Sequence, residues 1–492
     1  MSGSAATGLD FVVLVAYLAG VTVWGAWLGR GQRAGSDYFL GRRELPWGAV
    51  MLSVVATETS TLTFLSIPGV AYLGGLGFLQ LTFGYVAGRV LVAVVLLPAY
   101  YSGELATAYQ LLEARFGLGT RRFTSAIFII TRLLADSVRL FATAVPVALV
   151  TGWPYPLSIL LIGVLTLAYT YVGGIKAVIW VDVLQMGLYL LGAIAAAVAL
   201  QLLVPGGWRE IFASASGAGK LAVFDFATDL SRPYTLWAGL LGGAFLSMAS
   251  HGTDQLIVQR LLTCRNLAAS RRALVTSGLA VVMQFALFLA IGVGLWAFYG
   301  GRSFERSDEI FALFIVNELP AGLTGLLVAG IFAAAMSSLS SSINSMASAS
   351  AYDFWAPVRR IDRDDESILR VGKAFTLVWA ALLVGGALLF IPLSREAAAV
   401  EVALGIASLV YGGLLGAFGL ALFVPAARQR DAVCAVAIGI SSMVCLWSLG
   451  RAFIAWPWYV LIGTIVTFGS GWVSAHLTGP SGRTGKGRGL NG

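Results

Sequence analysis

Long apolar segments recur along this chain, and they restrict its fold more than any other feature. Thirteen segments come close to or exceed the roughly 20 residues that a helix needs to cross a bilayer. They cover 9–28, 46–70, 76–100, 123–150, 156–172, 181–204, 234–258, 274–299, 322–350, 371–393, 400–424, 432–449 and 456–476. Only 11% of the residues are charged, against about a quarter in soluble domains. The chain is therefore expected to be an all-α polytopic membrane protein.

Lys and Arg residues are distributed unevenly between the two sets of loops. Twenty-two, including Lys176 and Arg260, fall in one set with the C-terminal tail, and seven fall in the other. Because cytoplasmic loops carry the excess of Lys and Arg, we expect a multi-pass protein of the inner (cytoplasmic) membrane, with its N-terminus outside and its C-terminus in the cytoplasm. The net charge of +8 then reflects topology, so the expected partner is the lipid bilayer and not nucleic acid.

Two of the segments contain polar or glycine-rich interruptions. One is Ala56–Thr63 within 46–70, and the other is Ser250–Gln255 within 234–258. Irregular backbone at membrane depth persists only where it is buried in protein or lines a cavity. Five segments begin at each interruption, and a broken first helix in each of two halves is typical of transporters built from an inverted repeat.

This pattern predicts six parts of the chain. They are an extra N-terminal helix and cytoplasmic loop (1–45), a first repeat (46–204), an external loop (205–233), a second repeat (234–424), C-terminal helices (425–476) and a disordered tail (477–492). The stretch 102–122 has helical spacing and is expected to lie along the membrane surface.

Four hydroxyl side chains lie within five residues of the segment 322–350. At about 100° per residue, Ser337, Ser338 and Ser341 share one helix face, and Ser340 lies at its edge. Neutral oxygens suit a monovalent cation that must bind and then leave. Small residues also line close helix contacts in membranes, with hydroxyls bonded to their own helix. Spacing alone leaves both interpretations open.

Ionisable residues inside the spanning segments are costly, so each needs a partner or a function. Arg132 and Asp136 are four residues apart, and Arg139 follows Asp136 by three. Such spacings place these side chains together on one helix face. We expect a structural Arg132–Asp136 ion pair, which leaves Arg139 as a candidate for the cavity. Asp182 has no basic residue nearby in sequence except Lys176, so it is either an interfacial cap or a carboxylate beside the serine cluster.

Several motifs in the same order resemble the sodium:solute symporters, a family that includes glucose, proline and sialic acid transporters. They are Gly173-Gly-Ile-Lys-Ala-Val-Ile-Trp-Val-Asp-Val-Leu-Gln185, Thr253-Asp-Gln-Leu-Ile-Val-Gln-Arg260, Ala334-Ala-Met-Ser-Ser-Leu-Ser-Ser-Ser-Ile-Asn-Ser345 and Thr131-Arg-Leu-Leu-Ala-Asp136. The chain resembles a bacterial member of this family, and the resemblance covers about residues 9–430. It implies a LeuT-like five-plus-five inverted repeat and sodium-coupled uptake of a small organic solute by alternating access. It implies no enzymatic activity, no catalytic residues and no obligate protein partner.

The resemblance also implies ligands for one sodium ion or two. The conserved sodium site of the family corresponds to the backbone oxygens of Ala56, Thr59 and Ala334 and the hydroxyls of Ser337 and Ser338. Some members hold a second sodium, and its ligands correspond to Asp182, Ser337, Ser340 and Ser341.

The solute is not identified by these motifs. Glucose-type members have aromatic residues before the Thr-Asp-Gln motif, whereas this chain has Ala249-Ser-His-Gly252. In sialic acid-type members an Arg binds the carboxylate, and the corresponding residue here is Ala135, one turn before Arg139. The candidate substrate contacts are Thr57, Glu58, Thr61, Gln80, Arg139, Ser250, His251 and Tyr411.

Two other functions stay open from sequence alone. One is proton coupling in the same fold, with Glu58 or Asp182 as the carrier. The other is a nutrient sensor that binds sodium and solute without transport. A membrane-embedded enzyme is disfavoured, because the serine cluster has no histidine near it in sequence to act as a base.

Overall fold

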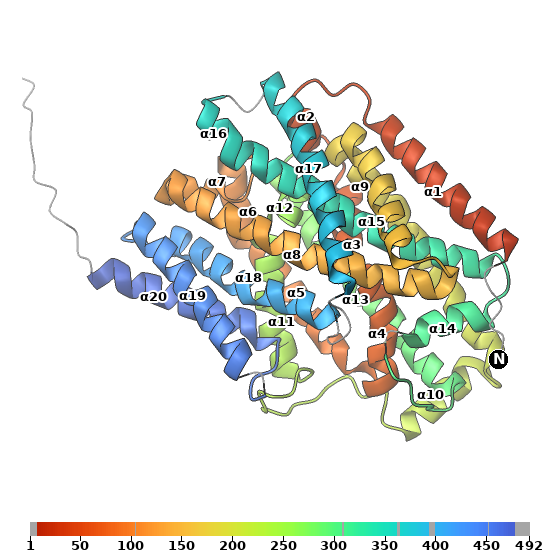
Figure 1. Cartoon of the computed structure of the whole chain (residues 1–492). Helices are drawn as coiled ribbons and strands as arrows, with labels where there is room; N and C mark the ends of the chain where they lie inside the picture. Colours follow the sequence, from red (N-terminus) through yellow and green to blue (C-terminus); the bar gives the residue numbers. More distant parts are fainter. Residues whose placement is uncertain are drawn as a thin grey trace, which may run out of the picture.

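The computed structural model describes residues 7–103, 105–307, 309–361, 365–392, 399–450 and 452–477, and these residues form helices joined by loops, without a β-sheet (Figure 1). The helices are α1 Gly8–Leu28, α2 Gly35–Leu40, α3 Trp47–Glu58, α4 Thr61–Gly74, α5 Leu79–Leu91, α6 Leu97–Ser102, α7 Gln110–Phe116, α8 Leu118–Thr151, α9 Tyr155–Leu203, α10 Gly207–Gly217, α11 Gly243–Gly252, α12 Gln255–Leu261, α13 Leu267–Phe298, α14 Glu309–Glu318, α15 Leu323–Ala349, α16 Ala356–Arg359, α17 Glu366–Phe390, α18 Ala399–Phe423, α19 Gln429–Leu449 and α20 Trp458–Leu477.

Among the described residues, eight helices are long and apolar enough to cross a membrane, or nine if α3 and α4 form one bent span. Three features account for most of the difference between this number and the thirteen apolar segments. The α9 helix has 49 residues and runs through two predicted segments. The α8 helix has 34 residues but carries Arg132, Asp136 and Arg139 in its middle. The α11 and α12 helices are each short, because the chain breaks between them.

Both interruptions predicted from the sequence are present as helix breaks. The α3 helix ends at Glu58, and α4 begins at Thr61 with its axis turned by 61°. Ser60 caps α4 by accepting a hydrogen bond from the Thr63 amide at 3.4 Å. The α11 helix ends at Gly252, and Asp254 caps α12 by accepting from the Leu256 amide at 2.9 Å.

A glycine turn divides α9 into the two segments expected from sequence. Gly174 has φ 53° and ψ −155°, a conformation that other residues rarely adopt. A Cβ atom at this position would also lie 2.5 Å from the Tyr38 carbonyl oxygen. Both observations explain why a glycine stands where the two arms of α9 meet.

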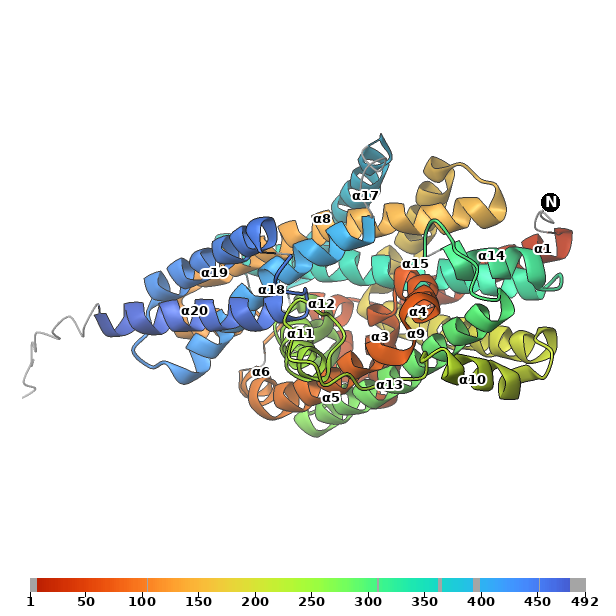
Figure 2. The same ribbon diagram turned by 90° about the horizontal axis from the view of Figure 1, so that it is seen from below.

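The helices pack around the two breaks. The α15 helix packs along α9, α18 packs on α8, α5 packs on α11, and α13 packs against both α3 and α4. The helices α18, α19 and α20 form a group on one side of the molecule, and α1 lies on the opposite side (Figure 2). The breaks are therefore enclosed by protein and do not face lipid.

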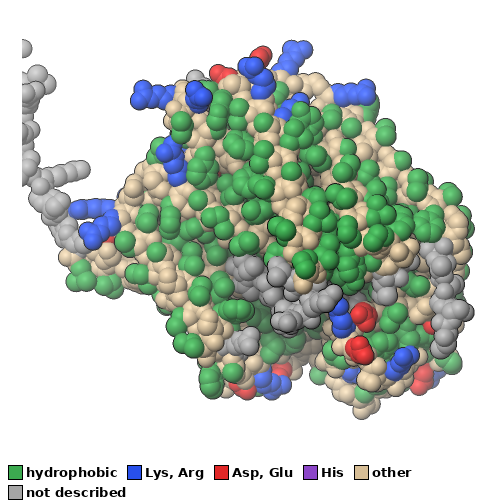
Figure 3. All heavy atoms as spheres, in the orientation of Figure 1, with side chains coloured by type: hydrophobic (Ala, Val, Ile, Leu, Met, Phe, Trp, Pro, Cys, Tyr) green, Lys and Arg blue, Asp and Glu red, His purple; other side chains and the backbone are tan. Residues whose placement is uncertain are grey.

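Apolar side chains cover the middle of the visible face, and charged side chains gather at its two ends (Figure 3). The end near α2 and α16 is rich in arginine, and we call it the basic end. Its exposed arginines include Arg30, Arg33, Arg42, Arg359 and Arg360. The opposite end, near α10 and α14, mixes both signs, as in the ion pair Arg306–Glu309.

Some expected loop features differ from the structure. The stretch 102–122, expected as a helix along the membrane surface, is divided: only 110–116 form a separate short helix, α7, and residues from Leu118 onward belong to the long α8 helix. The loops at 205–233 and 300–321 contain the short helices α10 and α14. Most of the tail predicted to be disordered (477–492) lies outside the described residues, which end at Leu477.

The contact between α5 and α11 depends on glycine. A Cβ atom at Gly88 would lie 2.3 Å from the Ala244 carbonyl oxygen, whereas one at Gly187 on α9 would meet no atom of the described residues within 4 Å. We expect Gly88→Ala to destabilise the protein by about 1–3 kcal/mol through overpacking. Gly187→Ala is the control and should leave stability unchanged or slightly raised. Thermal unfolding of the two purified variants would measure this, and equal melting temperatures would contradict the packing described here.

Candidate functional site

The break between α3 and α4 lies against one face of α15. Before the break, the Thr57 hydroxyl is 3.2 Å from the Ser341 hydroxyl. After the break, the Thr61 hydroxyl donates to the Ile331 carbonyl at 3.0 Å. The part of α15 between these two contacts must therefore face the break. On that part lie three of the predicted sodium ligands, Ala334, Ser337 and Ser338.

Uncommitted oxygens lie on both sides of this contact. The Ser338 hydroxyl is buried and has no hydrogen-bond partner among the described residues. The Ser60 amide, which would continue the α3 helix by donating to Ala56, donates to the Glu58 carbonyl at 3.2 Å instead. Buried polar groups normally have partners. The Ser338 hydroxyl oxygen and the Ala56 carbonyl oxygen are therefore available to a ligand that carries positive charge.

The turn itself is held from α13. The Thr59 hydroxyl donates to the Val55 carbonyl at 2.9 Å and accepts from the Gln284 amide at 2.7 Å. Its side chain is therefore committed to keeping the turn in place. Thr59 is predicted to bind sodium through its backbone oxygen, so the contacts of its side chain are compatible with that role.

Asp182 lies deep in the bundle next to the serine cluster. Its side chain is fully buried, and it accepts hydrogen bonds from Ser337 at 2.7 Å and from Ser53 at 2.6 Å. It also pairs with Arg260 at 3.1 Å. Of the two alternatives for Asp182, this position agrees with a carboxylate beside the serine cluster and not with an interfacial cap. Its basic partner is not the nearby Lys176 but Arg260, 78 residues away in sequence. Arg260 was assigned to a cytoplasmic loop, but the structure places it on α12, also fully buried.

The serines predicted to hold a second ion have other contacts in this structure. Ser340 donates to the Ser337 carbonyl at 3.0 Å. Ser341 donates to the same carbonyl at 2.6 Å and accepts from Arg260. Asp182 and Ser337 are therefore brought together, whereas Ser340 and Ser341 donate their hydroxyl hydrogens to their own helix.

A second charge network joins α8 to the other break. Arg132 donates to Asp254 and, at 2.6 Å, to the Tyr411 hydroxyl. Tyr411 in turn donates to Asp254 at 2.8 Å. The predicted Arg132–Asp136 pair is present at 3.6 Å, but the hydrogen bonds of Arg132 go to other residues. The network therefore connects α8 and α18 to the start of α12.

Asp136 instead connects α8 to α15 and to Arg139. It accepts from Ser342 at 2.5 Å and pairs with Arg139 at 3.3 Å. The Arg139 side chain keeps 24% of its surface exposed. Among the predicted substrate contacts it is thus a charged group that still has access to solvent.

Glu58 belongs to a third group of polar residues beside the first break. It pairs with Arg89 on α5, and His251 on α11 lies 3.6 Å away. The Ser250 hydroxyl is 2.8 Å from the other ring nitrogen of His251. The Glu58 side chain is 21% exposed. Three of the predicted substrate contacts, Glu58, Ser250 and His251, therefore lie together.

Gln80 lies apart from these groups. Its amide donates to the carbonyls of Gly77 and Tyr234, each at 3.1 Å, and accepts from the Asp225 amide at 3.0 Å. All of these contacts are made to backbone groups, and the side chain is fully buried. Gln80 thus joins the start of α5 to the loop that follows α10.

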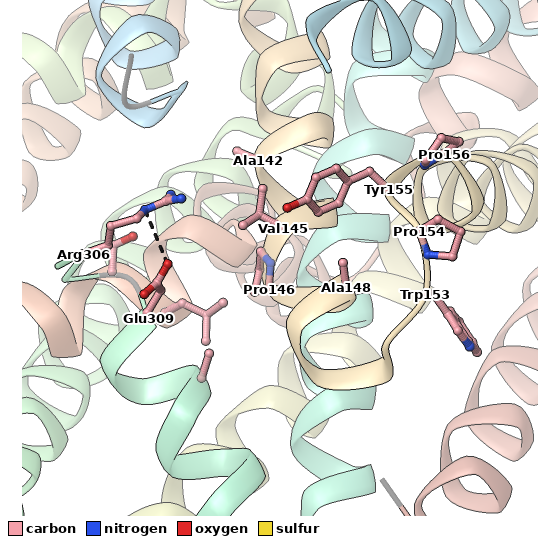
Figure 4. Close-up of a pocket in the computed structure, with 13 residues that line it drawn as sticks. Ala142, Val145, Pro146, Ala148, Trp153, Pro154, Tyr155, Pro156, Arg306 and Glu309 are labelled. Carbon is pink, nitrogen blue, oxygen red and sulfur yellow. Dashed lines mark ion pairs between the residues drawn. The ribbon is translucent and has the colours of Figure 1, made fainter. Parts of the chain in front are cut away.

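A cavity of about 530 Å³ opens on the α14 side of the first break (Figure 4). Its wall is formed by α4, the end of α8, the turn into α9 and the start of α14. The residues that line it include Leu65, Ser66, Val145, Trp153, Tyr155, Arg306 and Glu309. No local sequence pattern indicates this cavity, because its walls come from segments far apart in the chain.

The chain is similar to known sodium symporters over most of its length. The model of the sodium:solute symporter family matches residues 38–443. The sodium/sialic acid symporter SiaT of Proteus mirabilis (strain HI4320) is 30% identical over 482 residues, covering 96% of each chain. The sodium/sialic acid symporter NanT of Aliivibrio fischeri (strain ATCC 700601 / ES114) is 29% identical, covering 95% of this chain and 93% of that relative.

Solved structures agree with this similarity. A sodium-coupled sialic acid symporter in a substrate-bound outward-open state, described as revealing a novel sodium site, matches with a TM-score of 0.87 at 29% identity. The match covers 96% of this chain and 99% of that one. A nucleobase-cation-symport-1 family transporter in a closed conformation matches with a TM-score of 0.51 at 12% identity, over 90% of this chain and 95% of that one, which supports the fold alone.

The Arg132–Asp254 pair should be strongly coupled, because both side chains are buried. Removing one member of a buried pair typically costs about 3–5 kcal/mol, since the other charge is left without a partner. We therefore expect Asp254→Ala to lower stability sharply, and to lower it much less in an Arg132→Met background. A double-mutant cycle by thermal or denaturant unfolding would measure this, and additive effects of the two substitutions would contradict the coupling.

Proposed function

The chain belongs to the sodium:solute symporter family, and from this premise we propose where sodium and solute bind and how the chain lies in the membrane. The protein is a transporter and not an enzyme. It couples the movement of a small solute to that of sodium by alternating access. The family assignment and the similarity to sodium symporters carry this activity. The positions of the binding residues rest on the contacts described above.

Our proposal for the fold is thirteen spanning segments, of which ten form two inverted repeats at 46–204 and 234–424. An inverted repeat makes each helix of the first half equivalent to one helix of the second half. A contact between the two halves should therefore have an equivalent contact elsewhere, and such pairs of contacts are found. The packing of α5 on α11 has its counterpart in α13 on α3 and α4. The packing of α15 on α9 has its counterpart in α18 on α8. Both breaks also lie in the first helix of a repeat, as inverted-repeat transporters require.

The basic end is proposed to face the cytoplasm. Arginines gather there, whereas the α10–α14 end carries charges of both signs (Figure 3). Since cytoplasmic loops are enriched in Lys and Arg, the N-terminus would lie outside and the C-terminus inside an inner membrane. The 530 Å³ cavity then opens toward the outside. This orientation agrees with an outward-facing state.

For the sodium ion, the proposed ligands are the backbone oxygens of Ala56, Thr59 and Ala334 and the hydroxyls of Ser337 and Ser338. One observation carries this proposal most strongly. The Ser338 hydroxyl is buried on the part of α15 that faces the break, and it has no hydrogen-bond partner in the described parts of the chain. Neutral oxygens bind sodium weakly enough to allow its release on the other side of the membrane. All of these ligands come from two segments, so the ion would join them.

This position explains how sodium can drive the solute. An ion that contacts both the break and α15 stabilises the arrangement in which the two lie together. Coupling requires such a preference, because a ligand with equal affinity for both states shifts nothing. A membrane potential of 100 mV contributes about 2.3 kcal/mol for each sodium that enters. Binding energy and potential then act in the direction of uptake.

The solute site is proposed to lie beside the ion, between the first break and α8. Glu58 and Arg139 are the charged candidates that keep some exposure, at 21% and 24%. Each is paired with a residue of opposite charge, so the site as a whole favours a small polar solute. Thr57 and Thr61 flank the sodium ligands. Ser250, His251 and Tyr411 complete the proposed contacts, and Gln80 is the least accessible of them.

Removing the Ser338 hydroxyl should weaken activation by sodium. A contact to a charged group is worth about 1.5–3 kcal/mol, so Ser338→Ala should raise the half-saturating sodium concentration at least about tenfold. Ser345→Ala is the control, because it removes a hydroxyl from the same helix two turns away, where Ser345 donates to Ser342. Sodium-dependent uptake into proteoliposomes would measure both. A wild-type sodium response in Ser338→Ala would contradict the assignment.

Ligand binding should also be visible as a gain in thermal stability. A ligand specific for the native state stabilises it by RT ln(1 + [L]/Kd). We expect sodium to raise the melting temperature of the purified protein more than potassium at equal ionic strength. A transported solute should add to this only in sodium. Sialic acid is the first solute to test, because relatives are named for it; other carboxylates, sugars and amino acids follow. Equal effects of sodium and potassium would contradict the sodium site.

A further inference from the structure

A glutamine is buried in the middle of α13, a helix long and apolar enough to span a membrane. Only 3% of the surface of Gln284 is exposed. An amide in an apolar interior is costly unless its polar atoms have partners. Its Nε2 atom donates to the Thr59 hydroxyl at 2.7 Å, whereas its Oε1 atom is buried and has no hydrogen-bond partner among the described residues. A leucine would avoid this cost, so stability does not explain the glutamine.

The hydrogen bond from Gln284 reaches the residue that follows the end of α3. Thr59 has φ −85° and ψ 89°, so it has left the helical conformation. Its hydroxyl donates to the Val55 carbonyl at 2.9 Å, which leaves its lone pairs to accept from Gln284. Two hydrogen bonds therefore hold the Thr59 side chain, one to α3 and one to α13. Because the backbone angles of Thr59 set the direction of its carbonyl, holding this residue also holds its backbone oxygen.

Packing fixes α13 against the helix that follows the break. Phe288, one turn after the glutamine, meets Phe64 on α4 with ring centroids 5.6 Å apart. Gly292, another turn along α13, lies so close to α4 that a Cβ atom there would be 2.1 Å from the Pro68 carbonyl oxygen. The α13 helix supplies none of the proposed sodium ligands, yet its position relative to the turn is fixed. It is therefore suited to support the turn from outside the ion site.

We propose that Gln284 is a positioning residue for sodium, which holds Thr59 so that its backbone oxygen is directed toward the ion. The proposal rests on the function proposed above, in which that oxygen is one of the sodium ligands. Gln284 acts through Thr59 and not by contact with the ion. A ligand group that is already in place binds more tightly than one that must be ordered on binding. The glutamine thus lowers the stability of the empty protein and raises its affinity for sodium.

A sodium titration of the melting temperature, on the purified full-length protein at constant ionic strength and without solute, would test this. We expect Gln284→Leu to weaken sodium affinity about two- to tenfold, the range of one hydrogen bond. In potassium alone the same variant should melt at the wild-type temperature or above it, because it removes a buried oxygen without a partner. A residue with a purely structural role would give the opposite, a lower melting temperature and unchanged sodium affinity.

Substitutions of Thr59 show whether Gln284 acts through the Thr59 hydroxyl. Thr59→Ser keeps the hydroxyl and should keep the wild-type sodium affinity. Thr59→Val keeps the backbone oxygen but loses the hydroxyl, so it should weaken sodium binding as Gln284→Leu does. The double variant Thr59→Val with Gln284→Leu should bind sodium no more weakly than Thr59→Val alone. Additive losses would mean that Gln284 affects sodium by another route, and would overturn the proposal.

Gln185 on α9 provides a matched control. It is also buried, donates through Nε2 to one hydroxyl, that of Tyr17 at 3.1 Å, and has an Oε1 atom without a partner in the described parts of the chain. Its hydrogen bond goes to α1 and not to the break, so Gln185→Leu should leave sodium affinity unchanged. Equal losses of affinity in the two glutamine variants would contradict a specific role for Gln284.

The outcomes separate this proposal from the sodium site itself. Suppose that Ser338→Ala weakens sodium binding, but Gln284→Leu binds sodium normally or cannot be isolated in folded form. The positioning role would then be overturned, and the sodium site would stand. A wild-type protein that sodium stabilises no more than potassium, or an unchanged affinity in Ser338→Ala, would overturn the sodium site and the positioning role with it.

Discussion

The contact between the broken α3–α4 helix and α15 is the interaction on which the rest of the structure depends. A helix that breaks at membrane depth leaves backbone groups without partners, and lipid cannot satisfy them. Here α15 supplies Ser341 on one side of the break and the Ile331 carbonyl on the other. The α13 helix holds the turn through Gln284. What is left between these contacts is a small set of neutral oxygens.

The two breaks are held by different physical means. Where the first break faces α15, the groups that meet are neutral hydroxyls and carbonyls, although the Glu58–Arg89 pair lies beside the same break, so a cation can enter and leave there at modest cost. Charged pairs hold the second break, through Asp254 with Arg132 and through Arg260 with Asp182. A buried pair is costly to separate because each charge loses its partner. The first break is thus suited to ion binding, and the second to defining which arrangement of helices is stable.

Much of the fold was predictable from local patterns. The apolar segments, the two interruptions and the serine face of α15 each depend on residues within a few turns of one another, and the structure contains all three. The partners of Arg132 and Asp182 were not predictable in this way. Arg132 has an acceptor four residues away in Asp136, yet its hydrogen bonds go to Asp254, which is 122 residues distant. Proximity in sequence therefore identified the Arg132–Asp136 pair, which is present, but it did not identify the residues to which Arg132 donates hydrogen bonds.

The sequence by itself determined that the chain is an all-helical multi-pass membrane protein, the position of both breaks and the family to which the chain belongs, because these follow from hydrophobicity, from helix-breaking residues and from short motifs. Only the tertiary structure decided which charges neutralise one another. Arg260 was counted among loop residues, since nothing near it in sequence requires a buried cation. Packing of α12 against α3, α9 and α15 places it beside Asp182. Electrostatic partners are chosen by distance in space, and that distance exists only after the helices have packed.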